Sequence, residues 1–131
     1  AHKFGFVGFI SDDDRNRLYK AADCAVFPSL YEPFGIVALE AMAAQCPVIV
    51  ASSGGLAEVV QHHVTGITVY PDSAESLAWG ILHALKYPAW SRARAANAYR
   101  MVTERYNWRG IAEKTLAVLA QVVEERKTAK W

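Results

Sequence analysis

Residues 24–52 read CAVFPSLYEPFGIVALEAMAAQCPVIVAS, and the expected fold class follows from this segment. It begins and ends with short apolar runs at residues 24–28 and 47–52. Both runs are too short for helices and show no polar alternation, which predicts buried strands. The segment between them, residues 36–44, is apolar except for Glu40 and predicts a buried helix. A strand, a helix and a second strand, with continuously apolar strands, are typical of a parallel sheet covered on both faces.

The same alternation continues on both sides of this stretch. Further apolar runs predict strands at residues 4–10 and 67–70. Helices are expected at residues 11–22, with Ser11 as the N-cap, and at residues 56–61, 74–86, 89–105 and 109–127. We therefore expect an α/β fold, a Rossmann-like parallel sheet of about four strands with helices on both faces and long C-terminal helices. A chain of 131 residues predicts a single domain, residues 1–131.

The composition argues against two classes of binding partner, nucleic acids and membranes. Fourteen basic and thirteen acidic residues give a formal net charge of +1, which argues against a nucleic-acid or membrane surface driven by bulk charge. Four tryptophans and six tyrosines are scattered, with no stacking stripe beside basic residues, so nucleic acid is not an expected partner.

Two cysteines, Cys24 and Cys46, lack the spacing of metal ligands and are interpreted as buried thiols in a reducing compartment. No apolar run is long enough to span a bilayer. The sequence therefore predicts a cytoplasmic location, with peripheral membrane association of a longer parent enzyme left open.

In parallel sheets, ligands bind beyond the carboxyl ends of the strands, here the loops after Ile10, Pro28, Ser52 and Tyr70. The loop after Pro28 carries Glu32, eight positions before Glu40. Pro33 and Gly35, which lie between the two carboxylates, predict a tight turn. The amides expected to be free at the helix start are those of Phe34, Gly35, Ile36 and Val37.

Free amides at a helix start bind anions, and carboxylates bind hydroxyl groups. A ligand with a phosphate in the middle and hydroxyls at both ends is a nucleoside diphosphate sugar, which we favour. The alternative is that Glu32 and Glu40 only form an internal cap and ion pair.

The block YEPFGIVALEAMAA, residues 31–44, resembles the Glu, seven residues, Glu signature of the family 4 retaining glycosyltransferases of GT-B fold. Similarity to the C-terminal domain of that family extends to residues 21–23, 27–29, 47–51, 54–58 and 106–108, so that it covers essentially the whole chain.

The resemblance implies a role for each matching residue. Glu32, the catalytic candidate, would bind hydroxyls of the donor sugar, and Glu40 would hold the ribose diol. The amides of Phe34, Gly35, Ile36 and Val37 would bind the diphosphate or the sugar, and the loop after Ile10 would lie near the base. The implied donor is a UDP-, GDP- or ADP-sugar, transferred with retention and without a metal or other cofactor; the acceptor is not implied.

The sequence departs from that family in two ways. Gln45 stands where the family usually has a helix-ending glycine, so it must adopt a strained conformation or end the helix otherwise. The family's C-terminal domain also begins two strands earlier, with an Arg and Lys pair on the diphosphate, and follows an acceptor-binding domain. The chain therefore resembles a fragment of an enzyme, a partial donor-binding domain that alone would be inactive.

The strand order of the family, 3-2-1-4-5-6, would leave residues 4–10 and 24–28 without their usual neighbours. Either residues 4–10 pair with residues 24–28, or two chains complete each other's sheet. We expect the chain to self-associate, because open apolar strand edges pair with other chains.

Other motifs have simpler interpretations. The acidic run at residues 12–14 favours a helix start over a metal cluster. The pair His62 and His63 is interpreted as loop surface. Residues 52–55, SSGG, fit a phosphate cradle and a plain strand-to-helix turn equally well. Two other functions remain open, a non-catalytic nucleotide-binding or assembly module of flavodoxin-like shape and a fragment of a GT-B-type sugar-nucleotide epimerase.

Overall fold

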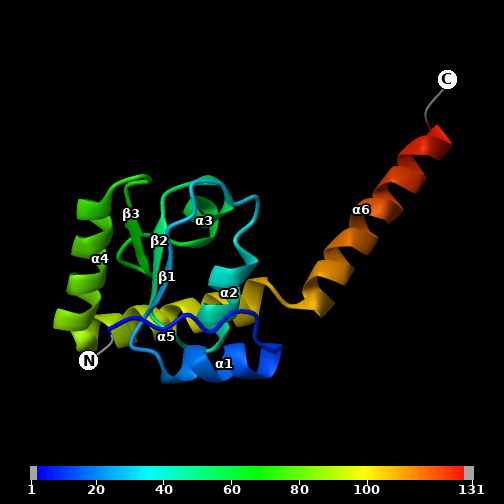
Figure 1. Cartoon of the computed structure of the whole chain (residues 1–131). Coiled ribbons are helices and arrows are strands. Elements are labelled where there is room, and N and C mark those ends of the chain that lie inside the picture. The colour runs from blue at the N-terminus through cyan, green and yellow to red at the C-terminus, as the bar shows by residue number, and fades with distance from the viewer. Residues whose placement is uncertain (1–2, 129–131) are drawn as a thin grey trace.

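The computed structural model describes residues 3–128, which form three layers and one projecting helix (Figure 1). The elements in chain order are α1 (Asp12–Ala21), β1 (Ala25–Phe27), α2 (Ile36–Ala43), β2 (Val48–Ala51), α3 (Gly54–Val59), β3 (Ile67–Val69), α4 (Ala74–Lys86), α5 (Pro88–Arg105) and α6 (Trp108–Thr128). The α/β fold with a parallel sheet is therefore confirmed.

The sheet has three described strands in the order β1-β2-β3, all parallel. Val26 of β1 is paired with Ile49 of β2, and Ile49 is paired with Ile67 of β3. All four residues of β2 are buried, which explains why its sequence is continuously apolar.

Helices cover both faces of the sheet, as predicted. Successive side chains of a strand point to opposite faces. Val48 and Val50 pack in one core with α2, α3 and α5, whereas Ile49 packs in a second core against α4. Because successive side chains of β2 point to opposite faces of the sheet, the interior is divided into two apolar clusters.

The predicted strand at residues 4–10 is wrong: this segment has no strand structure. Its side chains Phe4, Phe6 and Phe9 are 85%, 100% and 103% exposed. A strand is stable only when a neighbouring backbone accepts its hydrogen bonds. Among the described residues, β1 is paired with β2 alone, so residues 4–10 are not hydrogen-bonded to its outer edge. Gly8, at φ 65°, also interrupts the extended backbone that pairing needs. Among the described residues, the sheet therefore has three strands instead of about four, and residues 4–10 do not pair with β1.

The ends of α1 and α2 follow the sequence signals. The Ser11 hydroxyl accepts a hydrogen bond from the Asp14 amide at 3.2 Å and caps α1, while Arg15 forms an ion pair with Asp12. The acidic run is thus a helix start. At the end of α2, Gln45 has φ 59°, so the glutamine accepts the left-handed conformation that a glycine would adopt freely, at a cost of about 1 kcal/mol.

Helix α6 extends away from the three layers (Figure 1). Its side chains Leu116, Leu119 and Val122 are 67%, 58% and 55% exposed, so no other described element covers the apolar face of this helix. Within residues 3–128, no helix has the length and apolar character that crossing a membrane requires.

Candidate functional site

The loop between β1 and α2 is fastened to the loop that follows β2. The Ser53 hydroxyl donates a hydrogen bond to the Ser29 carbonyl oxygen at 2.6 Å. The Gly55 amide donates to the Glu32 carbonyl oxygen at 2.8 Å. Two loops 24 positions apart in sequence therefore lie side by side at the carboxyl edge of the sheet.

The two glycines at the start of α3 permit this approach. A Cβ on Gly54 would overlap the carbonyl oxygen of Glu32, and a Cβ on Gly55 would overlap the backbone of Phe34. Gly54 also has φ 46°, which side chains rarely tolerate. The SSGG segment is thus a strand-to-helix turn whose missing side chains make room for the loop of Glu32. Whether it also contacts phosphate stays a prediction.

Glu32 shapes the start of α2. Its Oε1 accepts a hydrogen bond from the Gly35 amide at 3.3 Å, and the side chain is half-buried. Gly35, at φ 89°, is the N-cap residue of α2, and its carbonyl oxygen accepts from the amides of Ala38 and Leu39. Among residues 3–128, no acceptor for the amides of Ile36 and Val37 is present. These two N–H groups are therefore free at the positive end of the helix.

Glu40 is held by a partner that sequence reasoning missed. Arg15 of α1 donates from Nη2 to Oε1 of Glu40 at 3.0 Å, and their side chains are 32% and 30% exposed. The pair lies 25 positions apart in sequence, so no local pattern could reveal it. The ion pair neutralises the one carboxylate of an otherwise apolar helix.

The cap and ion pair that the sequence left as an alternative thus exist in the structure without a ligand. Glu32 uses only Oε1 in the cap, and Glu40 uses only Oε1 in the ion pair. Oε2 of Glu32 and Oε2 of Glu40 accept no hydrogen bond from any described residue, so each can still accept one from a hydroxyl group.

The remaining predicted residues surround this loop less tightly. Ile10 is half-buried immediately before Ser11, whose carbonyl oxygen accepts from the Arg15 amide. The segment after Ile10 therefore lies one helical turn from the Arg15–Glu40 pair. Phe34 is half-exposed and packs edge-on against Tyr106, with ring centroids 6.2 Å apart. Tyr106 belongs to a motif noted in the sequence, but its contact with this loop was not predicted.

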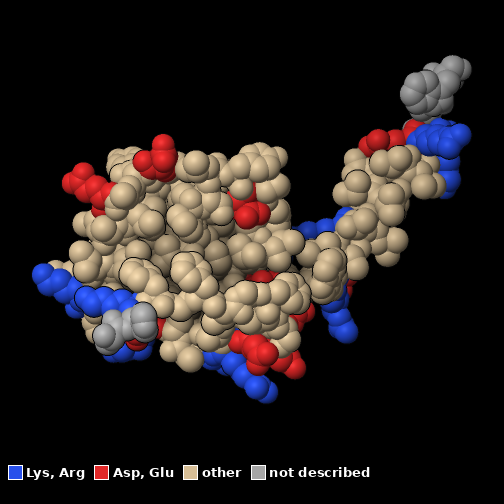
Figure 2. All heavy atoms as spheres, in the orientation of Figure 1, with Lys and Arg blue, Asp and Glu red and all other residues tan. Residues whose placement is uncertain are grey.

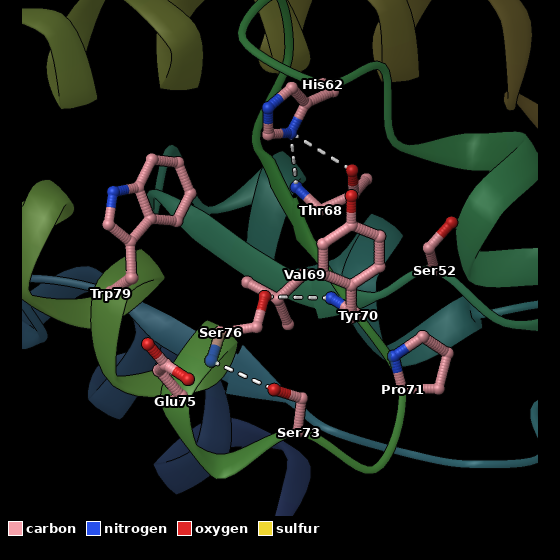
Figure 3. A pocket seen from close by; sticks show the side chains of 10 residues that line it. All are labelled: Ser52, His62, Thr68, Val69, Tyr70, Pro71, Ser73, Glu75, Ser76 and Trp79. Atoms are coloured by element: carbon pink, nitrogen blue, oxygen red, sulfur yellow. Dashed lines mark hydrogen bonds between the residues drawn. The ribbon is translucent and has the colours of Figure 1, made fainter.

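A cavity opens at the carboxyl ends of β2 and β3 (Figure 3). It lies at the loops after Ser52 and Tyr70, two of the loops in which the sequence predicts ligand binding. Its volume is about 850 Å³, and α4 contributes Trp79 to its wall. It does not include Glu32 or Glu40. Within the described range, no cluster of three or more His, Cys, Asp or Glu residues is arranged to hold a metal ion. Charged side chains in Figure 2 form no continuous patch of one sign on the visible face.

Comparison with known proteins places the chain in a family. The family model described as Glycosyl transferases group 1 matches residues 1–125. An uncharacterized glycosyltransferase of Methanocaldococcus jannaschii is 48% identical over 123 residues, which cover 94% of this chain and 32% of that protein. Sucrose-phosphate synthase of Thermosynechococcus elongatus has 40% identity and a TM-score of 0.84, covering 92% of this chain and 30% of that one.

The structure of Anabaena HepE in complex with UDP and glucose has 30% identity and a TM-score of 0.82, and the match covers 89% of this chain and 32% of that protein. The chain thus spans about a third of the length of each of these three proteins. The resemblance inferred from residues 31–44 is confirmed: the chain belongs to the glycosyl transferases group 1 family and has the fold of a GT-B glycosyltransferase domain.

Proposed function

We propose that residues 1–131 are part of the C-terminal, donor-binding domain of a family 4 retaining glycosyltransferase. The observation that carries the proposal is the arrangement at the start of α2, where the carboxylates of Glu32 and Glu40 flank the free amides of Ile36 and Val37. A nucleoside diphosphate sugar has the complementary groups in the same order, because hydroxyl groups lie on either side of its anionic diphosphate. The bound UDP and glucose in the HepE structure support this donor class.

Each group has one task in this proposal. The free amides and the positive end of α2 bind the diphosphate, which gains charge as the glycosidic bond to it breaks. Oε2 of Glu32 accepts a hydrogen bond from a sugar hydroxyl and fixes the sugar at the reacting carbon. Oε2 of Glu40 accepts from the ribose diol, while Oε1 stays with Arg15. The segment after Ile10 contacts the base. No metal takes part.

The first experiment measures nucleotide binding to the full 131-residue chain by calorimetry, with UDP, GDP and ADP. We expect UDP to bind to the wild type. Glu40→Gln should lower the affinity for UDP about tenfold or more, because a hydrogen bond to a charged group contributes about 1.5–3 kcal/mol. Glu113→Gln on α6 is the matched control, since this carboxylate is exposed and remote from the loop. Equal affinities for the wild type and Glu40→Gln would refute the ribose contact.

A second measurement separates the two carboxylates in the whole enzyme proposed here. Glu32→Ala should lower turnover, since its hydroxyl contact lies at the reacting sugar. Glu40→Ala should mainly raise the KM for the donor, since the ribose is a remote binding handle. The 131-residue chain alone should bind the donor without transferring sugar, because transfer needs donor and acceptor held together.

If the whole protein bound the donor but transferred no sugar, a non-catalytic nucleotide-binding module would be the better description; interconversion of the nucleotide sugar would identify an epimerase. The cytoplasmic location expected from the sequence remains a prediction.

A further inference from the structure

We propose that the β3–α4 pocket binds a neutral saccharide, at a site separate from the loop of Glu32 and Glu40. The pocket is the cavity of about 850 Å³ between the carboxyl ends of β2 and β3 and the start of α4 (Figure 3). Its character comes from six residues, Ser52, His62, Thr68, Tyr70, Glu75 and Trp79.

Aromatic rings form part of the wall. Trp79 is 45% exposed and Tyr70 is 78% exposed, and both line the open cavity. A large apolar ring beside polar groups suits a ligand that has one apolar face and a polar rim. A pyranose ring has this character, because its C–H bonds gather on one face and its hydroxyls lie around the edge.

The polar groups of the pocket are free to bind a ligand. Among the described residues, the Ser52 hydroxyl, the Tyr70 hydroxyl, the Glu75 carboxylate and the Trp79 indole N–H have no hydrogen-bond partner. They comprise donors, an ionised acceptor and hydroxyls that do both. Sugar hydroxyls also donate and accept, so this mixture complements a polyol.

His62 adds a donor whose orientation is fixed. The Thr68 amide donates to Nδ1 of His62 at 3.0 Å, which places the ring proton on Nε2. Burial lowers the pKa of His62, and the neighbouring His63 and Arg94 lower it further, so the imidazole is neutral at pH 7. His62 therefore lines the pocket without bringing a positive charge to it.

Hydrogen bonds hold the frame of the pocket in place. The Tyr70 amide donates to the Ser76 hydroxyl at 3.0 Å, and the Ser76 amide donates to the Ser73 hydroxyl at 3.1 Å (Figure 3). The Ser52 amide donates to the Val69 carbonyl oxygen at 2.8 Å. Because the backbone is fixed at these points, binding need not order it, which lowers the entropic cost.

No side chain that lines the pocket offsets the negative charge of a donor nucleotide. Glu75 is its one charged lining residue, and no Lys or Arg is among the residues that line it. Glu75 lies in the first turn of α4, where its charge opposes an approaching phosphate. A neutral oligosaccharide suffers no such repulsion, and the carboxylate can accept its hydroxyl protons.

The test uses the ¹⁵N-labelled full chain and the indole N–H resonances of its tryptophans. Trp79→Phe identifies the resonance of Trp79 by its loss. The probes are maltotriose, cellotriose and mannotriose as neutral saccharides, with UDP and inorganic phosphate as anions. We expect at least one saccharide to shift the Trp79 resonance saturably, with affinity in the millimolar range, and neither anion to displace it.

Matched variants locate the binding. Trp79→Ala and Glu75→Gln should each weaken saccharide binding about tenfold or more, whereas Trp90→Ala should leave it unchanged, because Trp90 lines a different cavity. Glu75 is exposed, so its variant keeps the fold and decides the result if Trp79→Ala does not fold. The proposal is overturned if none of the three saccharides binds saturably, if Glu75→Gln binds as the wild type does, or if UDP or phosphate competes for the pocket.

Discussion

At the scale of single residues, the candidate site depends on contacts between atoms far apart in sequence. Glu40 lies in an apolar helix, and its charge is tolerated because Arg15 of α1 reaches it at 3.0 Å. The Glu32 carbonyl oxygen is held by the Gly55 amide at 2.8 Å. Both glutamates are evident in the sequence, yet neither Arg15 nor Gly55 could be assigned to them before the chain was folded.

Gly55 offers a direct test of this loop packing. In Gly55→Ala, the new methyl group would overlap the backbone of Phe34, which cannot move aside as a flexible side chain would. We expect the free energy of unfolding to fall by about 1–3 kcal/mol in urea denaturation. UDP binding should weaken too, because Phe34 leads into the free amides of α2.

Gly5→Ala is the control for Gly55→Ala. A Cβ at Gly5 would meet nothing within 4 Å, so its unfolding free energy should stay within about 0.5 kcal/mol of the wild type. Equal stability of the two variants would show that the loop and the start of α3 are not packed as described.

At the scale of elements, residues 4–10 and α6 differ from the rest of the chain. Both expose apolar side chains that no other described element covers, including Phe6 at 100% and Leu116 at 67%. Apolar clusters of this kind on a surface mark sites of association. The two segments therefore offer alternative surfaces for the self-association expected from the sequence.

We expect residues 4–10 to drive that association, because no described strand pairs with them or with the outer edge of β1. Light scattering on dilute wild-type protein should report a species larger than a monomer. Phe6→Ser with Phe9→Ser should restore the monomer at little cost in stability, since both rings are fully exposed.

The matched control is Leu116→Ser with Leu119→Ser on α6, which should leave the larger species intact. Loss of association in the α6 variant alone would assign the contact to α6 instead. A wild-type protein that is folded and monomeric would contradict the expectation of self-association.

At the scale of the whole molecule, stability rests on the two apolar cores on either face of the sheet. Cys46 belongs to the first core and is 2% exposed. Burial raises the pKa of this thiol from 9.0 to about 11, and the nearby Cys24 adds to the effect. Folding therefore favours the neutral thiol, which resists ionisation until well above its ordinary range.

This shift predicts how stability depends on pH. Since the folded pKa is above the unfolded one, the contribution is complete below about pH 9 and is lost as the pH rises towards 11. The loss attributable to Cys46 should reach about 2 kcal/mol. Urea denaturation across this range should show a steeper decline for the wild type than for Cys46→Ala, which lacks the thiol. Parallel curves would contradict the prediction.

Most of the helices and strands, and the family, could be predicted from local patterns in the sequence. β1, β2 and β3 were found because their apolar runs are short and continuous, and α1 because Ser11 caps it. These signals lie within a few residues of one another. The block at residues 31–44 likewise contains its own signature, and it identified the loop of Glu32 and Glu40 without reference to any other part of the chain.

Whether a segment finds a partner in the fold could not be predicted from such local patterns. Residues 4–10 have the composition of a strand, but a strand requires a second backbone to accept its hydrogen bonds, and no described strand pairs with them. The same reason explains the Arg15–Glu40 pair and the β3–α4 pocket, which unite residues from separate elements. Contacts of this kind depend on the positions of whole helices and strands in space, which packing of the two cores establishes and no local pattern encodes.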